Sequence, residues 1–412
     1  TRAVLAARLQ SLCQGVSGGR VELLERLQAF LAHDILPLIP EEGSVGASGD
    51  LTPLSYVAAT LSGEREVMYH GERRSAADVH REMGWQPLVL RPKEALALMN
   101  GTAVMTGLAC LAFARADYLL KLATRITALN VVALQGNPEH FDERLFAAKP
   151  HSGQMQVAAW LRQDLAIDAP TAPLHRLQDR YSLRCAPHVL GVLADSLGWL
   201  RGFIETELNS ANDNPIIDAE AERVLHGGHF YGGHIAFAMD SLKTLVANVA
   251  DLLDRQFALL VDVRYNHGLP SNLSGASAER SMLNHGFKAV QIGASAWTAE
   301  ALKQTMPASV FSRSTECHNQ DKVSMGTIAA RDALRVLELT EQVAAATLLA
   351  AHQGVWLRSR EAEARELPPA LAAMHQELLG DFAPVIEDRA LDSDLRLCLT
   401  RIAEQHWRLH AQ

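Results

Sequence analysis

The sequence predicts an all-α fold, a bundle of long helices with a minor β component. Four stretches carry apolar residues at helical spacing, and they are residues 93–133, 235–261, 278–304 and 323–353. The first of them contains no proline. The second has a three–four alternation typical of a seam between packed helices, at Leu242, Leu245, Val249 and Leu252.

Shorter elements and joints are predicted between these stretches. The chain opens within a helical pattern of apolar residues, and because its first residue is Thr1 we expect a natural start further upstream. An amphipathic run covers residues 21–39. Strand-like alternation is limited to residues 66–69, 215–217 and 224–225. Glycine and proline clusters mark joints at residues 36–40, 136–138, 169–173, 227–233 and 269–276.

The composition is that of a water-soluble globular protein, with 48% hydrophobic and 21% charged residues. No composition shift marks a linker in the 412 residues, so we expect one helical unit, with the bundle in residues 1–355 and a polar helical part in residues 356–412. A net charge of -9 without a block of Lys and Arg argues against a nucleic-acid partner. Apolar runs such as residues 343–351 are too short to span a bilayer. Five scattered cysteines, never in a CxxC pair, fit a cytoplasmic protein.

Residues 43–50, with the sequence GSVGASGD, are the most unusual stretch. Their ordinary interpretation is a loop between two helices. Position 50 is Asp, so Ser48 is not in a serine-hydrolase elbow, and no Gly-Lys-Ser/Thr follows to form a P-loop. A glycine amide folded back on the carbonyl two residues earlier, with serine between, can cyclise and lose water. Loss of the serine hydroxyl then leaves a methylidene electrophile.

Further motifs follow along the chain, and they are Asn100-Gly101-Thr102, Tyr181-Ser182-Leu183-Arg184-Cys185, Asn212-Asp213-Asn214-Pro215, residues 265–273 (YNHGLPSNL) and His318-Asn319-Gln320-Asp321. Together with Ala47-Ser48-Gly49, their order resembles that of the aromatic amino acid ammonia-lyases and 2,3-aminomutases. The resemblance implies a 4-methylideneimidazol-5-one (MIO) ring formed from Ala47, Ser48 and Gly49, without a metal or nucleotide. It also implies a long-helix bundle of the fumarase and aspartase type. A homotetramer with shared active sites, and an upstream segment with a catalytic Tyr on a mobile loop, are implied as well.

Tyr181 and Arg184 lie between a polar stretch and an apolar run. An arginine in that place is ordinarily a solvated surface charge. The resemblance implies instead that Arg184 binds the substrate carboxylate, for which its planar guanidinium is suited. It implies that Tyr181 lies near the electrophile, and Gln178 is a matched position about one turn earlier.

Asn214 ends a run of short polar residues before a proline, where a helix end and an Asx turn are the ordinary interpretation. The resemblance implies that Asn214 and Asn100 hold the carbonyl of the electrophile or the substrate carboxylate. It implies that Leu96 and Met99 line the apolar wall of the substrate pocket. The ordinary role of such residues is to pack in the core on one face of a helix.

His226, His229 and His234 have a spacing that a metal site could use. The glycines between the first two remove the helix that would orient such ligands, and no Cys, Asp or Glu adjoins them, so we expect no metal. The stretch resembles a Gly-Gly-Asn-Phe segment of the family, with His229 in the place of Asn. Phe230 matches as a pocket aromatic.

Residues 316–321 concentrate acids, amides and an imidazole before a long helix, which is ordinarily an N-terminal capping region. The resemblance is closer to phenylalanine and tyrosine lyases, and it implies that Glu316 faces the substrate amino group while Gln320 helps to hold the site. We therefore predict an ammonia-lyase that converts Phe or Tyr to a trans-α,β-unsaturated aryl acid. Three alternatives stay open: an aminomutase, a histidine ammonia-lyase that gives urocanate, and an inactive helical scaffold.

Overall fold

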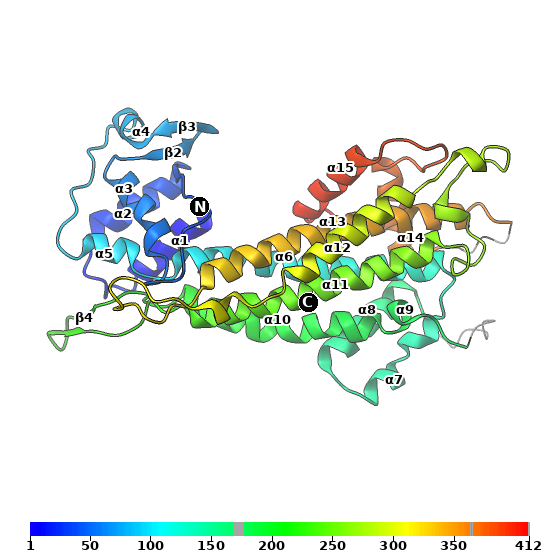
Figure 1. The fold of residues 1–412 in the computed structure, drawn as a ribbon, viewed down its shortest axis with the longest axis horizontal. Coiled ribbons are helices and arrows are strands. Elements are labelled where there is room, and N and C mark those ends of the chain that lie inside the picture. Colours follow the sequence, from blue (N-terminus) through cyan, green and yellow to red (C-terminus); the bar gives the residue numbers. More distant parts are fainter. Residues whose placement is uncertain (168–176, 363, 365, 411–412) are drawn as a thin grey trace. The chain divides into compact units, whose positions relative to one another are not determined.

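The computed structural model describes the chain except residues 168–176, 363, 365, 411 and 412. It is 60% helix and 5% strand, with several helices longer than 20 residues, and the prediction of an all-α fold with minor β is confirmed (Figure 1).

The contacts divide the chain into two compact units. Unit 1 comprises residues 1–113, 199–241 and 306–334, and unit 2 comprises residues 114–198, 242–305 and 335–412. Four of the five changes from one unit to the other fall within α6, α10, α11 and α13, and the fifth falls between α12 and η4. The sequence division after residue 355 is not tested by this grouping and stays a prediction.

Up to α6, the elements are α1 (Arg2–Leu12), α2 (Val21–Ala32), β1 (Leu36–Pro37), α3 (Leu51–Leu61), β2 (Glu66–Tyr69), β3 (Glu72–Ser75), α4 (Ala76–Glu82), α5 (Glu94–Met99) and α6 (Ala103–Ala133). Next come η1 (Pro138–Phe141), α7 (Glu143–Ala147), α8 (Ser152–Asp164), α9 (Tyr181–Arg184), α10 (Ala186–Leu208), β4 (Ile216–Asp218), β5 (Arg223–Leu225) and α11 (Gly233–Val261). The last are η2 (Ser271–Leu273), η3 (Ser281–Leu283), α12 (Lys288–Lys303), η4 (Ala308–Phe311), α13 (Gly326–Arg358), α14 (Pro369–Asp381) and α15 (Asp392–Ala403).

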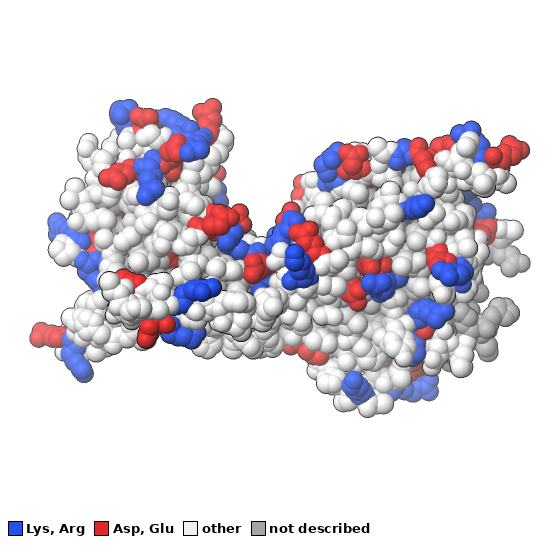
Figure 2. Space-filling model, in the orientation of Figure 1, with Lys and Arg blue, Asp and Glu red and all other residues white. Residues whose placement is uncertain are grey.

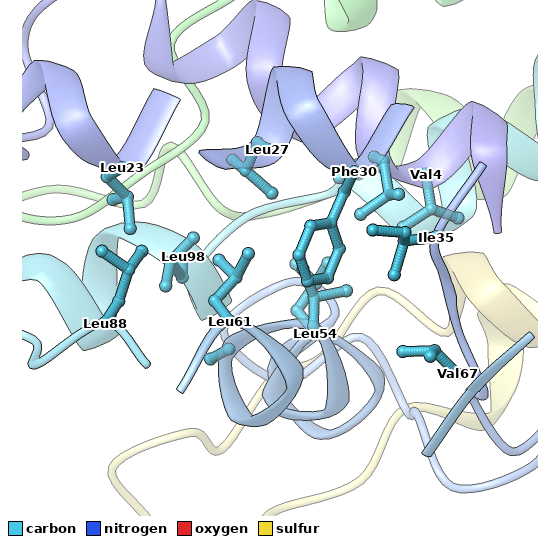
Figure 3. Close-up of a cluster of buried hydrophobic side chains, with 14 of the residues drawn as sticks. Val4, Leu23, Leu27, Phe30, Ile35, Leu54, Leu61, Val67, Leu88 and Leu98 are labelled. Atoms are coloured by element: carbon cyan, nitrogen blue, oxygen red, sulfur yellow. The ribbon is translucent and has the colours of Figure 1, made fainter. Parts of the chain in front are cut away.

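The core of unit 1 is built where α1, α2, α3 and α5 meet (Figure 3). On α2, Leu23, Leu27 and Phe30 recur at helical spacing and are buried. Leu54 on α3 and Leu98 on α5 are buried in the same cluster. A three-stranded antiparallel sheet in the order β1-β2-β3 adds to this unit, in register Glu66↔Ser75. This core supports the loop of residues 43–50, because α3 begins directly after it.

Buried polar contacts hold the elements of unit 2 together. Arg358 on α13 donates from Nε to the carbonyl of Ala133 (2.8 Å) and from Nη2 to that of Asn266 (2.6 Å). Gln256 on α11 donates from Nε2 to Thr127 Oγ1 (3.0 Å) and to the carbonyl of Ser182 (2.9 Å). The second bond fixes the short helix α9, which carries Tyr181 and Arg184.

The predicted helices and strands agree with the structure in most places. The amphipathic run of residues 21–39 is helical only to Ala32, and strands β1 and β3 were not predicted. Two further differences concern long helical stretches. The helical pattern of residues 93–133 is broken between α5 and α6, because Gly101 has a φ of +151° and pairs with the loop of residues 43–50. In residues 278–304 the helix begins only at Lys288, after turns and η3. The predicted joint at residues 169–173 lies outside the described residues.

Helix α6 is long and apolar enough to be considered as a membrane span, which the sequence analysis did not predict. By length and composition α6 could cross a bilayer, with a mean hydropathy of 1.4 over its most apolar window, but 61% of that window is buried in the protein. Such burial is what the core helix of a globular protein shows. On the face that Figure 2 presents, acidic and basic residues are interspersed, which agrees with the absence of Lys and Arg blocks from the sequence.

Candidate active site

The loop of residues 43–50 is fixed in an unusual backbone conformation. Ser48 has a φ of +50° and Gly49 a φ of +76°. Gly49 forms a parallel bridge with Gly101, whose amide donates to the Ser48 carbonyl (3.1 Å) and whose carbonyl accepts from the Asp50 amide (2.7 Å). A Cβ at position 49 would lie 2.2 Å from the Gly101 carbonyl oxygen, so the approach requires glycine.

Asp50 anchors the loop from its other end. Its buried carboxylate accepts from the amides of Val104 (2.9 Å) and Met105 (2.8 Å) at the start of α6, and from the hydroxyls of Ser44 (3.2 Å) and Thr327. Burial raises the pKa of this carboxyl to about 6, although the hydrogen bonds act in the opposite direction. A single side chain thus joins the loop to the first turns of α6 and α13.

Gln320 contacts Ser48 directly. Its Nε2 donates to Ser48 Oγ (2.8 Å), and its Oε1 accepts from Thr315 Oγ1 (3.0 Å). The intervening turn is closed by backbone hydrogen bonds between Thr315 and Gln320. Three consecutive residues in it, Glu316, Cys317 and His318, have φ values of +45° to +64°. This conformation is rare for residues other than glycine, and here it brings an amide to the serine hydroxyl.

Asn100 and Asn214 are joined through hydrogen bonds beside the loop. The buried Asn100 donates from Nδ2 to the carbonyl of Asn214 (2.7 Å) and to Asp213 Oδ1 (3.1 Å). Asn214 Oδ1 accepts from the amide of Gly227 (2.8 Å). Asp213 is buried and forms an ion pair with Lys93 (2.6 Å). The predicted residues Ser48, Asn100, Asn214 and Gln320 therefore belong to one hydrogen-bonded region of unit 1.

The geometry is compatible with cyclisation of Ala47-Ser48-Gly49. The Gly49 amide and the Ala47 carbonyl, which are the two reacting groups, lie on either side of Ser48 in this turn. The loop on both sides is held by Gly101 and Asp50. Such preorganisation lowers the conformational cost of bringing the amide onto the carbonyl.

Comparisons with known proteins identify the family. A model of the family described as "Aromatic amino acid lyase" matches residues 1–379. This chain belongs to that family. It is 38% identical to histidine ammonia-lyase of Bacillus velezensis over 397 residues, which are 96% of this chain and 76% of that protein. It is 39% identical to tyrosine 2,3-aminomutase of Chondromyces crocatus over 409 residues, covering 94% of this chain and 75% of that one. The crystal structure of histidine ammonia-lyase from Trypanosoma cruzi has a TM-score of 0.90, with 32% identity and coverage of 98% and 76%.

Membership of the aromatic amino acid lyase family confirms the resemblance inferred from the motifs. It also makes this chain a lyase-family member whose relatives act on small amino acids. The preference for Phe or Tyr is not confirmed, because the similar proteins include histidine ammonia-lyases.

The other predicted residues of unit 1 have different surroundings. Met99 packs against the apolar core, which is the ordinary role considered for it, whereas Leu96 is 37% exposed. Phe230 is half-buried, and His229 is exposed. Glu316 is exposed within its strained turn. This turn ends before α13 begins at Gly326, so residues 316–321 do not cap that helix. Among the described residues no group of three or more His, Cys, Asp or Glu side chains is arranged for a metal ion.

Three predicted residues belong to unit 2. Gln178, Tyr181 and Arg184 line a cavity of about 730 Å³ in that unit. Tyr181 is 72% exposed. The Arg184 guanidinium lies over its ring, 4.6 Å from the centroid, and Arg184 Nε donates to the carbonyl of Asp179 (3.0 Å). The Asp179 carbonyl thus occupies Nε of the Arg184 guanidinium.

Sequence reasoning missed the residues that support the site. Asp50 stands where an N-cap of α3 would, but its carboxylate bonds to the first amides of α6 instead. An acidic residue at the end of a glycine-rich loop was the available signal. Arg8 is buried in α1 and bonds to the carbonyls of Asn100 and Asn212. Nothing in the local pattern around Arg8 distinguishes it from an exposed arginine.

Proposed function

We propose that this chain is an ammonia-lyase for an aromatic L-amino acid, with an MIO ring formed from Ala47, Ser48 and Gly49. The observation that carries the proposal is this loop, in which Ser48 has a left-handed backbone conformation and the residues around it are held by Gly101 and Asp50. When formed, the ring supplies an electrophilic carbon that no ordinary side chain offers. Family membership supports the reaction class.

The side chains have separate roles in this proposal. Gln320 holds the Ser48 hydroxyl through its amide before the ring forms. Asn100 donates to the Asn214 carbonyl and to Asp213 and so positions Asn214, whose amide group faces the electrophile carbonyl or the substrate carboxylate. Arg184 binds the substrate carboxylate through its two terminal nitrogens. Tyr181 lies near the electrophile, Gln178 helps to bind the substrate, and Glu316 faces the substrate amino group. We propose a cytoplasmic homotetramer whose active sites draw residues from more than one subunit.

For the substrate, we propose L-histidine before Phe or Tyr. The similarity to histidine ammonia-lyases over most of the chain supports this choice, although the motif around Glu316 suggested the benzenoid amino acids. An imidazole needs a polar partner for each ring nitrogen, and the exposed His229 could serve as one. The 39% identity to a tyrosine 2,3-aminomutase supports a second candidate, in which the ammonia is added back at Cβ.

The test compares the full chain with two serine variants. Mass spectrometry of the parent should show a deficit of two waters, and turnover of L-His, L-Phe and L-Tyr should be followed by their unsaturated products and any β-amino acid. We expect urocanate to form at least about tenfold more efficiently than the other products, a difference of roughly 1.4 kcal/mol.

Ser48→Ala should keep the fold but lose both the mass deficit and nearly all activity. Ser55→Ala, which removes a hydroxyl bonded to the Thr52 carbonyl on α3, should keep both. Parental turnover by Ser48→Ala would exclude the ring mechanism. Faster formation of cinnamate or coumarate would overturn the histidine proposal, and β-amino acid as the main product would support the aminomutase.

A further inference from the structure

Arg8 on α1 is a fully buried arginine beside the candidate site, with 0% exposure. Its Nη1 donates to two main-chain carbonyls at once, those of Asn100 (3.1 Å) and Asn212 (3.0 Å). The two carbonyls lie 112 positions apart in the chain, in two of the motifs that define the site. A single guanidinium nitrogen therefore joins the Asn100 motif to the Asn212–Pro215 motif.

The charge of Arg8 is not neutralised by a directly bonded carboxylate. Its burial lowers the pKa of Arg8 to about 10, and the charge of nearby Asp213 acts in the opposite direction, so the side chain stays protonated at neutral pH. Asp213 is itself paired with Lys93 (2.6 Å). One carboxylate, Asp213, thus faces the two cations, while the carboxylate of Glu207 accepts from Thr102 Oγ1 (2.6 Å) two positions after Asn100. Because burying a charge is costly, a fully buried Arg8 without a directly bonded carboxylate calls for a reason beyond packing.

Arg8 also contacts the segment of Asn100 and Gly101, which pairs with the Ser48 loop. A Cβ at Gly101 would lie 2.2 Å from Arg8 Nη1 and 2.4 Å from the Asn212 carbonyl oxygen. The same Gly101 donates to the Ser48 carbonyl and accepts from the Asp50 amide. Any displacement of Arg8 therefore moves the peptide on which both the loop and the Asn100 side chain depend.

We propose that Arg8 is a positioning residue for the reaction: it aligns the Asn100 and Asn214 segments with the Ser48 loop, and its buried positive charge favours an anionic substrate group beside Asn100. This inference rests on the proposed function, because it concerns the same site. It differs from a purely structural role, in which loss of Arg8 would lower stability but leave the folded enzyme unchanged.

The experiment measures kcat and KM per ring-containing site in the full chain. Arg8→Lys keeps the charge but loses the planar guanidinium, and Arg8→Met removes both the charge and the hydrogen bonds. Arg2→Met is the matched control, since Arg2 lies on the same helix and forms a surface ion pair with Asp34. Ring content is determined from the mass deficit, and folding from circular dichroism and Tm.

We expect kcat/KM per ring to fall at least tenfold in Arg8→Lys and further in Arg8→Met, with KM for the amino acid substrate rising most in Arg8→Met. Arg2→Met should stay within twofold of the parent. A folded Arg8→Lys protein without the ring would also support the proposal, because Gly101 links Arg8 to Ser48.

If Arg8→Met does not fold, the Arg8→Lys result decides. A lowered Tm with kcat/KM per ring within twofold of the parent would overturn the proposal. A parent that forms no ring and turns over no amino acid would instead reject the proposed function.

Discussion

At the scale of single residues, the buried carboxyl group of Asp50 holds the reactive loop, and its protonation affects the stability of the fold. Its pKa is raised to about 6 by burial, from 3.8 in an exposed chain. The folded state therefore binds the proton more tightly, and this contribution to stability is present below about pH 4 and is lost as the pH rises to about 6. We expect the loss to be on the order of 2–3 kcal/mol.

Asp50→Asn cannot ionise, so its stability should lack this decline between pH 4 and 6. Urea unfolding of the parent and the variant at pH 4, 5, 6 and 7 measures the difference. Asp34→Asn, at an exposed ion pair with Arg2, is the control and should follow the pH curve of the parent. If the free energy of unfolding depended on pH in the same way in the parent and in Asp50→Asn, ionisation of Asp50 would not destabilise the folded state, and the prediction would be wrong.

Arg184 is the second residue whose chemistry can be tested alone. Its Nε is used by the Asp179 carbonyl, so a substrate carboxylate would be held by the two terminal nitrogens. Arg184→Lys keeps the charge but loses this fork, and we expect kcat/KM to fall by about 2–3 kcal/mol in free-energy terms, the value of a charge-assisted hydrogen bond. Steady-state kinetics measure the change, with Arg255→Lys at an exposed position as the control. Parental kinetics for Arg184→Lys would exclude it from the site.

Candidate site residues could be named from the sequence only where they belong to a motif that resembles one of the family. The Ser48 triad, Asn100, Asn214 and Gln320 could be named from their motifs, and the structure joins them in one hydrogen-bonded region. The supporting residues could not, since the roles of Arg8 and Asp50 arise from contacts with segments far along the chain. Such contacts are set by tertiary packing, which local patterns do not encode.

At the scale of elements, α13 and α14 share a buried histidine pair. His352 and His375 lie with their Nδ1 atoms 3.0 Å apart. Burial, and then the charge of His375, lowers the pKa of His352 to about 4, and burial lowers that of His375. Because the folded pKa values are depressed, their contribution to stability is present above about pH 6.5 and is lost as the pH falls toward 4.

We expect the parent to lose on the order of 3 kcal/mol of stability from His352 over this range. His352→Gln should show a smaller acid-induced loss, measured by thermal unfolding at pH 7.5, 6 and 5. The control is His151→Gln, at an exposed histidine of the same unit. An unchanged pH dependence in His352→Gln would place the acid sensitivity elsewhere.

Helices were predictable where apolar spacing continued without proline, as in α11 and α13. The break between α5 and α6 was not, because residues 100–102 are helix-compatible in sequence and are pulled out of the helix by pairing with the Ser48 loop. The first part of the stretch of residues 278–304 also looked helical. There Asn284 and the amides of His285 and Gly286 instead bond to Glu387 and Asp388.

At the scale of the whole molecule, the site residues are divided between two units. The Ser48 loop and its amide partners belong to unit 1, and Gln178, Tyr181 and Arg184 belong to unit 2. The family resemblance predicted active sites shared among subunits, which gives a reason for this division. The proposal of shared active sites therefore predicts that activity requires an oligomer.

Exposed aromatic residues give a way to test the oligomer. On α11 of unit 1, Phe237 is 58% exposed and contacts Trp199 of α10, with ring centroids 5.9 Å apart. Covering a large apolar side chain by another subunit contributes about 1.5–3 kcal/mol, and a symmetric assembly repeats the gain.

We expect sedimentation to show four chains per particle for the parent. Phe237→Glu should shift the particle to smaller species and lower the activity with it, since a buried, unpaired carboxylate is costly. Val21→Glu introduces the same charge at the exposed start of α2 and should leave the particle intact. A parent that is active as a monomer at working concentration would contradict the tetramer and remove the need for shared sites.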